Sequence, residues 1–175
     1  MKNLKAIIFD LDGTLIHSAP DMQAAVNVTL NTLGREALDL STIISFIGNG
    51  FENLVEQSLD ATGRYDGSVR QTALDLYLKS YNQNITTLTR PYPGVVSALR
   101  EFQRAGVLMG ICTNKLTKPA KEICARLDLM QFFKVIAGAE DYQPRKPDPA
   151  SLLNCIKDLS STPSETLYVG DSTID

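Results

Sequence analysis

Hydrophobic residues recur along the chain with two different periods, and these periods predict its secondary structure. Short apolar runs predict buried strands at residues 5–9, 107–113, 134–138 and 166–171. Apolar residues at three- and four-residue spacing predict helices at 95–105 and 118–127, and a third helix follows the proline-rich loop that begins at Gln143. Strands that alternate with helices are typical of βαβ units. The pattern therefore predicts an α/β fold with a Rossmann-like parallel sheet core.

Residues 18–87 show only the helical period, and they lie between the first and second predicted strands. Three- and four-residue spacing begins after Pro20, at Met22, Ala25, Val26, Thr29, Leu30 and Leu33. We therefore expect an all-helical cap at residues 18–87, inserted into a core domain that residues 1–17 and 88–175 form.

Composition and charge narrow the function classes. The 175 residues suffice for one domain, or for a core domain with a small insertion. The net charge is −3 and the Lys and Arg residues are dispersed, so no basic stripe favours a nucleic-acid partner. The apolar run near the N-terminus is too short for a signal peptide, and no run is long enough to span a membrane. We expect no nucleic-acid or membrane partner.

The cysteines and the histidine exclude further classes of site. Cys112, Cys124 and Cys155 are odd in number and lack CxxC spacing, which favours reduced, buried thiols and a cytoplasmic protein. His17 is the only histidine, so the chain has neither a His-rich metal site nor a Ser-His-Asp triad built on another imidazole.

Polar side chains follow each predicted strand, where open parallel sheets bind their ligands. These residues are Asp10 and Asp12, then Thr113 and Asn114, then Lys146, and finally Asp171 and Asp175. Carboxylates such as Asp10 and Asp171 are hard oxygen ligands that suit Mg²⁺ beside a phosphate. An ionised aspartate can attack phosphorus, and a second carboxylate two residues on can serve as general acid and base. The set therefore predicts Mg²⁺-dependent phosphoryl transfer through an aspartyl-phosphate.

The same residues carry a resemblance to a known family. "DLDGT" after a buried strand, "TN" after the second, the lysine of "RKPDP" and the final "GDSTID" resemble the four motifs of the haloacid dehalogenase superfamily. "PGVVSALREFQRAG", "TNK", "KPDP" and "IGNG" are similar to its phosphoglycolate phosphatase group, which has a helical cap after the first motif. The resemblance covers essentially the whole chain.

The resemblance implies catalytic and metal-binding roles for the aspartates. Asp10 would be the nucleophile and a metal ligand. Asp12 would be the general acid and base, and would bind the metal through its backbone carbonyl. Asp171 would be a further metal ligand, and Asp175 would orient the site or a metal-bound water.

The resemblance also implies a phosphate site and a cap contact. Thr113, Asn114 and Lys146 would hold the phosphate, although Thr113 could also cap the helix that follows it. Gly13 and Thr14 would support the first motif. Gly48, Asn49 and Gly50 of the cap would contact the substrate, although a short loop between helices also explains a "GNG" sequence. His17 departs from the group, where an aspartate is usual, and we expect it to make a hinge hydrogen bond.

These observations predict a phosphatase that acts on a small phosphorylated metabolite, with 2-phosphoglycolate as the best single substrate. A sugar phosphate, pyridoxal phosphate or pyrophosphate would need the same chemistry, and a phosphomutase would use the same aspartyl-phosphate. A non-catalytic relative that acts by binding is the alternative of another class. We expect a monomer or a homodimer.

The end of the chain predicts an exposed strand. In the strand order that the family implies, the strand before Gly170 would lie inside the sheet, yet nothing follows Asp175. We expect this strand to be an apolar edge, and the 175 residues to be a truncated form or the ordered part of a longer chain.

Overall fold

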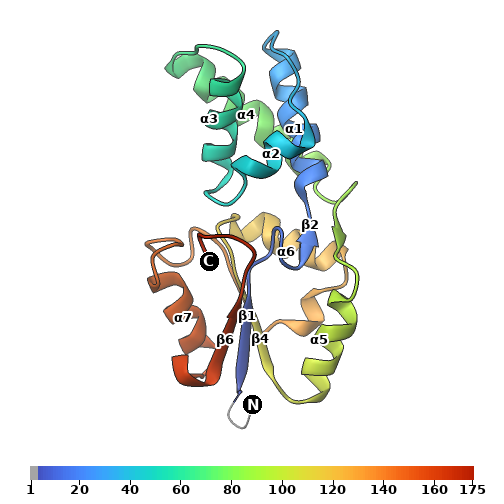
Figure 1. Cartoon of the computed structure of the whole chain (residues 1–175), viewed down its shortest axis with the longest axis vertical. Coiled ribbons are helices and arrows are strands. Elements are labelled where there is room, and N and C mark those ends of the chain that lie inside the picture. Colours follow the sequence, from blue (N-terminus) through green and yellow to red (C-terminus); the bar gives the residue numbers. More distant parts are fainter. Residues whose placement is uncertain (1–3) are drawn as a thin grey trace. The chain divides into compact units, whose positions relative to one another are not determined.

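A computed structural model describes residues 4–175 of the chain (Figure 1). The chain forms two compact units. One contains the residues up to His17 together with Arg90–Asp175, and we call it the core unit. The other is Ser18–Thr89, which we call the helical unit.

The core unit is built on a parallel sheet of four strands. These are β1 (Ala6–Phe9), β4 (Leu108–Cys112), β5 (Val135–Ala137) and β6 (Thr166–Val169), in the order β5-β4-β1-β6. Ala6 lies opposite Leu108 on one side and Thr166 on the other, so all three strands run in register toward the same edge. The prediction of an α/β fold with a parallel sheet is confirmed.

Helices cover both faces of this sheet. They are α5 (Val95–Arg104), α6 (Thr117–Arg126) and α7 (Ala150–Asp158), with short 3-10 helices at Met130–Phe132 and Pro163–Glu165. Figure 1 shows α5 and α7 on opposite sides of the strands. The chain passes from β1 outward to β4 and β5 and then returns beside β1 as β6, so its direction reverses at β1. Ligand sites of such sheets lie where the direction reverses.

The strand β6 lies at the edge of the sheet, as predicted. Its Leu167 side chain is 47% exposed, although its partner residue in β1, Ile7, is buried. An exposed apolar edge is the consequence of having a neighbour on one side only.

A second, two-stranded sheet was not predicted. The strands β2 (Ile16–His17) and β3 (Arg90–Pro91) pair antiparallel, with His17 opposite Arg90. These are the two segments that connect the core unit to the helical unit. Two residues per strand are too few to produce a recognisable hydrophobic period, so only the pairing itself reveals them.

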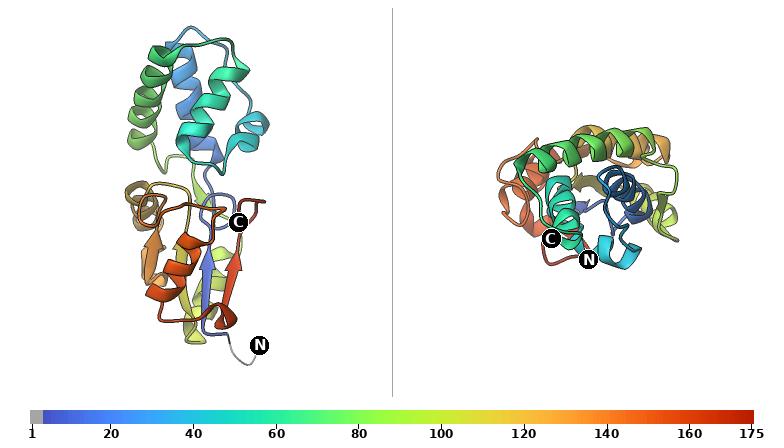
Figure 2. Two further views of the ribbon diagram at one scale, coloured as in Figure 1. Left: turned by 90° about the vertical axis from the view of Figure 1, so that its left-hand side faces the viewer. Right: turned by 90° about the horizontal axis from the view of Figure 1, so that it is seen from above.

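The helical unit contains α1 (Ala19–Thr32), α2 (Leu40–Phe46), α3 (Phe51–Ala61) and α4 (Gly67–Gln83) (Figure 2). The apolar face of α1 packs mainly against α4. Tyr77 of α4 is stacked between Phe51 and Tyr81, with ring centroids 6.3 and 5.5 Å away. Within the described residues, no helix has both the length and the apolar character of a membrane span.

Candidate active site

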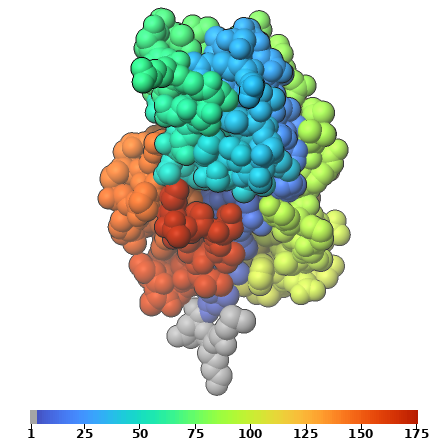
Figure 3. Space-filling model, turned by 45° about the horizontal axis from the view of Figure 1, so that its top comes forward, coloured from blue at the N-terminus to red at the C-terminus, as the bar shows by residue number. Residues whose placement is uncertain are grey.

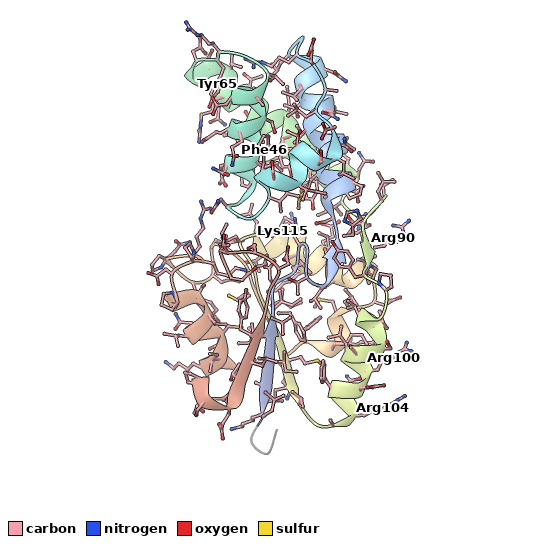
Figure 4. The ribbon with its side chains drawn as sticks, viewed as in Figure 1. Phe46, Tyr65, Arg90, Arg100, Arg104 and Lys115 are labelled. Carbon is pink, nitrogen blue, oxygen red and sulfur yellow. The ribbon has the colours of Figure 1, made fainter. Side chains whose placement is uncertain are left out.

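The predicted site residues of the core unit come together at the carboxyl edge of the sheet. Asp10 directly follows β1, Thr113 directly follows β4, and Asp171 lies two residues beyond β6. Figure 4 shows Lys115 at this same edge, above the strand ends. In the space-filling view the last residues of the chain lie at the surface of the core unit, beside the segment that leads into α7 (Figure 3). Lys146, which is buried in that segment, belongs to the site.

Lys146 is the centre of the site. Its side chain is only 7% exposed, and its ammonium group donates three hydrogen bonds. They reach Asp10 Oδ1 at 2.7 Å, Asp175 Oδ1 at 2.6 Å and the Tyr168 hydroxyl at 2.8 Å. Residues separated by 136 positions in sequence are thus joined by one ion pair. Burial by itself would lower the pKa of Lys146, but the carboxylates of Asp10 and Asp175 raise it by a larger amount. The pKa is therefore higher than usual, and the ammonium stays charged.

The pKa values of the two carboxylates are shifted in opposite directions. Burial raises the pKa of Asp10 from 3.8 to about 6, although Lys146 opposes this rise. Burial also raises the pKa of Asp175, but hydrogen bonds from Lys146 and Tyr168 outweigh it and bring the value to about 2. Both groups are ionised above pH 7, and Asp10 is the one close to changing its charge.

Asp175 is held by the backbone of its own loop. Its Oδ2 atom accepts hydrogen bonds from the amides of Asp171 and Ser172 and from the Ser172 hydroxyl, at 2.9–3.1 Å. A β-carbon on Gly170 would lie 2.3 Å from Asp175 Cγ, so only glycine fits at that position. This explains locally why the fourth motif contains a glycine before its first aspartate.

Asp171 is fixed from the first motif. The Thr14 hydroxyl donates to Asp171 Oδ1 at 2.9 Å. Gly13 has φ of +94°, and a β-carbon there would lie 2.2 Å from Asp171 Oδ2. Carboxylate atoms of Asp10, Asp171 and Asp175 lie within 4.8 Å of one another and could hold a metal ion. Gly13 and Thr14 thus lie against this group.

Asp12 is held apart from that group by a second lysine. Lys115 Nζ lies 3.0 Å from Asp12 Oδ2, and the two side chains are 8% and 11% exposed. The side-chain carboxylates that could hold a metal are those of Asp10, Asp171 and Asp175, and Asp175 had been expected only to orient the site or a metal-bound water. A metal contact through the backbone carbonyl of Asp12 stays a prediction.

Thr113 and Asn114 are buried beside the lysine. The Asn114 side-chain amide donates to the Lys146 carbonyl at 3.0 Å, and the Lys115 amide donates to Thr113 Oγ1 at 3.2 Å. The first amide of α6, that of Thr117, is bound by the Glu140 carboxylate instead of by Thr113. Phosphate binding by Thr113, Asn114 and Lys146 stays a prediction, but the three residues are neighbours.

The sequence analysis assigned no role in the site to two side chains, Tyr168 and Lys115. Tyr168 read only as an apolar strand residue, yet its hydroxyl contacts both Lys146 and Asp175. Lys115 had no assigned partner, and it pairs with Asp12. A tyrosine in a strand predicted to be buried, shortly before a carboxylate motif, was the available signal, because a phenol inside the protein needs a polar partner.

The predicted contacts outside this group belong to other parts of the chain. Gly48, Asn49 and Gly50 form the loop between α2 and α3 of the helical unit, where Gly48 and Gly50 have φ of +129° and +87°. Their contact with substrate stays a prediction. His17 lies in β2, and its ring nitrogen is 3.4 Å from the Tyr92 hydroxyl.

Comparison with known proteins gives one family. The model of the haloacid dehalogenase-like hydrolases matches residues 7–175. A phosphoglycolate phosphatase of Cereibacter sphaeroides is 40% identical over 98% of this chain and 78% of its own length. A phosphoglycolate phosphatase of Nitrosospira multiformis is 36% identical over 98% of this chain and 77% of its own.

Solved structures agree with this family. A crystal structure described as a predicted phosphoglycolate phosphatase from Haemophilus somnus is 27% identical and has a TM-score of 0.95. The match covers 100% of this chain and 80% of that one.

Proposed function

The chain belongs to the haloacid dehalogenase-like hydrolase family, and from this premise we propose that it is a phosphatase for small phosphate monoesters, with 2-phosphoglycolate as its preferred substrate. Two relatives at 40% and 36% identity that bear the name phosphoglycolate phosphatase support the substrate. The observation that carries the chemistry is the buried Asp10 carboxylate, 2.7 Å from the Lys146 ammonium and grouped with Asp171 and Asp175.

The carboxylate group fits Mg²⁺ by the chemistry of its donors. Asp10, Asp171 and Asp175 offer hard anionic oxygens within 4.8 Å of one another, which is the ligand type that Mg²⁺ prefers. We assign Mg²⁺ binding to these three carboxylates, with the Asp12 carbonyl as a further ligand. When bound, Mg²⁺ would supply positive charge that offsets the negative charge of the substrate phosphate.

Asp10 has the properties of a nucleophile. With a pKa of about 6 it is ionised at pH 7 and above, and burial leaves it less solvated than an exposed carboxylate. Its oxygen attacks phosphorus, a bond forms between Asp10 and the phosphoryl group, and the bond to the substrate oxygen breaks. Asp12 gives its proton to the departing oxygen, which leaves as an alcohol.

The second half of the reaction restores Asp10. Asp12, now ionised, takes a proton from a water molecule, and that water attacks phosphorus. The acyl-phosphate bond breaks, inorganic phosphate leaves and the Asp10 carboxylate returns. Lys115, whose ammonium lies 3.0 Å from Asp12 Oδ2, holds this side chain in place.

The phosphate group is bound by donors around Asp10. Lys146 brings an ammonium to the nucleophile itself, and the buried Thr113 and Asn114 lie beside it. Fixed donors stabilise the negative charge that develops on the phosphoryl oxygens in the transition state. Removing one such donor typically lowers kcat by about 100- to 1000-fold.

One assay tests the enzyme class. Phosphate release from p-nitrophenyl phosphate and from 2-phosphoglycolate is measured with Mg²⁺ for the wild type and for Asp10→Asn. We expect the variant to retain less than about 0.1% of wild-type kcat, because it lacks the attacking carboxylate. Asp128→Asn is the matched control: this exposed aspartate has φ of +56°, which asparagine tolerates, and it should keep full activity. A wild type that releases no more phosphate than Asp10→Asn would exclude the phosphatase.

A substrate panel tests the specificity. We expect kcat/KM to be highest for 2-phosphoglycolate, and lower for a sugar phosphate, pyridoxal phosphate and pyrophosphate. A phosphomutase would move phosphate between positions of one sugar without releasing it, and a non-catalytic relative would bind the compounds unchanged. A cytoplasmic location and a monomeric or homodimeric state stay predictions; the buried free thiols of all three cysteines are consistent with the first.

A further inference from the structure

Tyr168 joins the hydrophobic core to the proposed active site. Its ring packs against a buried cluster that includes Ala6, Ile8 and Cys155. Its hydroxyl lies 2.8 Å from Lys146 Nζ and 2.8 Å from Asp175 Oδ1, with the Cys112 carbonyl at 3.4 Å. An apolar ring with a polar tip can therefore position charged groups from a rigid base.

The hydroxyl has a distinct role among the partners of Lys146. The ammonium has three N–H groups, and they reach Asp10, Asp175 and Tyr168. Asp10 and Asp175 attract the ammonium by charge, and such attraction depends little on direction. The phenol oxygen is a neutral, directional acceptor, and it also donates its own proton to Asp175. It thus sets the direction in which the flexible lysine stem extends.

We propose that Tyr168 is a positioning residue for phosphoryl transfer, which acts by holding the Lys146 ammonium and the Asp175 carboxylate in place through one hydroxyl group. This rests on the proposed function, because it assigns Lys146 to the phosphate. Burial and the neighbouring Asp10 and Asp175 carboxylates raise the pKa of Tyr168, so the hydroxyl keeps its proton at neutral pH.

Tyr168→Phe removes the hydroxyl and keeps the ring in the core. Without it, one N–H of Lys146 and one lone pair of Asp175 lose their partner, and Lys146 is held by the carboxylates alone. We expect kcat to fall about tenfold, because small misplacement of a charged donor is costly in the transition state. KM should change less than about threefold, because the ammonium still attracts a phosphate without exact placement.

A matched tyrosine separates positioning from packing. Tyr142 also packs against the same buried cluster and donates its hydroxyl to a carboxylate, that of Asp158. Tyr142→Phe therefore removes a comparable hydrogen bond outside the site. We expect it to keep wild-type kcat and KM. An equal loss of kcat in both variants would overturn the proposal, because a general packing effect would then explain Tyr168→Phe.

A double-mutant cycle tests the route of action. Tyr168→Phe is combined with Lys146→Met, which keeps the length of the stem but removes the ammonium. If Tyr168 acts through Lys146, adding Tyr168→Phe to Lys146→Met should lower kcat by less than about twofold. An additional tenfold loss in the double variant would show that Tyr168 does not act through the lysine.

A measurement without substrate keeps this test independent of the proposed function. In the wild type, nitrogen-15 NMR should show a slowly exchanging Lys146 ammonium and a protected Tyr168 hydroxyl proton. The ammonium should exchange faster in Tyr168→Phe and should be unchanged in Tyr142→Phe. Rapid exchange of both groups in the wild type would overturn the proposal. If the wild type hydrolysed no phosphate ester but showed the protected signals, the proposed function would fail while the hydrogen-bonded arrangement stood.

Discussion

Each of the two units contains a buried aspartate, and the two carboxylates have different kinds of partner. Asp10 in the core unit is 7% exposed and Asp21 in the helical unit is 2% exposed. Asp21 accepts hydrogen bonds from the Leu88 and Thr89 amides and the Thr89 hydroxyl, at 2.7–3.0 Å. Asp10 is paired with Lys146, and its pKa is raised to about 6.

The difference separates a structural carboxylate from a reactive one. The partners of Asp21 are neutral groups that belong to the chain around it, so it joins the start of α1 to the segment after α4. The partner of Asp10 is a charged side chain on a flexible stem, and two further carboxylates lie nearby. Buried charge that is only partly compensated is typical of functional sites. Substitutions should therefore affect activity in one unit and stability in the other.

The largest effect is expected from Lys146→Met in the core unit. It leaves Asp10 and Asp175 without their shared cation and removes a phosphate donor. We expect kcat/KM for 2-phosphoglycolate to fall about 1000-fold, since removing one preorganised donor alone costs up to that factor. Lys118→Met, at an exposed lysine of α6, is the control and should match the wild type. Activity within tenfold of the wild type for Lys146→Met would remove the lysine from the mechanism.

The next largest effect is expected from Asp21→Ala in the helical unit. It leaves the buried amide and hydroxyl of Thr89 without their carboxylate partner. We expect the free energy of unfolding to fall by about 3 kcal/mol, the cost of unsatisfied buried donors, while the folded protein keeps wild-type kcat. Urea unfolding and the phosphatase assay measure both. The exposed N-cap variant Asp66→Ala should lose less stability. Loss of kcat without loss of stability in Asp21→Ala would contradict the comparison.

A somewhat smaller effect is expected in the pH dependence of stability without metal. Because the folded pKa of Asp10 is raised from 3.8 to about 6, its protonation favours the folded state at low pH. That contribution is complete below about pH 3.8 and is lost as the pH rises through about 6.

Asp10→Asn cannot ionise, so it should gain stability relative to the wild type between pH 4 and pH 7. The gain should reach at most roughly 3 kcal/mol, the free energy that a rise from 3.8 to about 6 represents. Urea unfolding at several pH values measures it, and saturating Mg²⁺ should reduce the gain because a cation favours the ionised carboxylate. A difference that does not vary with pH would show that burial does not raise the pKa of Asp10.

The smallest effect is expected from a pair of glycines, one in each unit. Gly13 and Gly34 have φ of +94° and +71°, so alanine should destabilise each by about 1–2 kcal/mol. At Gly34 no atom lies within 4 Å of a new β-carbon, whereas at Gly13 it would displace the Asp171 carboxylate. We therefore expect only Gly13→Ala to weaken Mg²⁺ binding, by about tenfold. Titration of Mg²⁺ by calorimetry distinguishes the two variants. Equal affinities would place Asp171 outside the metal site.

Much of the fold could be predicted from the sequence, because its signals are local. The run before Asp10 is short and wholly apolar, as a strand buried on both faces must be. The three- and four-residue period after Pro20 predicts α1, which begins at Ala19. The pairing of β2 with β3 could not be predicted in this way, since it involves two residues per strand that lie far apart in the chain.

The sequence predicts most of the residues that form the site, but it does not predict which of them pair with each other. Asp10, Asp171 and Lys146 follow strands, and parallel strands end at one edge, so their convergence follows from the pattern. Which lysine pairs with which aspartate does not follow. Lys115 and Lys146 both lie near carboxylates, and only the three-dimensional arrangement assigns Lys115 to Asp12 and Lys146 to Asp10.

The sequence by itself therefore determined the class of fold, the order of its motifs and the family, because hydrophobic period and motif spacing are properties of neighbouring residues. Only the tertiary structure decided which of the charged side chains lie beside one another. It placed Asp175 with Asp10 and Asp171, set Asp12 beside Lys115, and brought the Tyr168 hydroxyl between Lys146 and Asp175. Hydrogen bonds and ion pairs act over only a few ångströms in space, so residues far apart in sequence form them only after the sheet has brought these residues together.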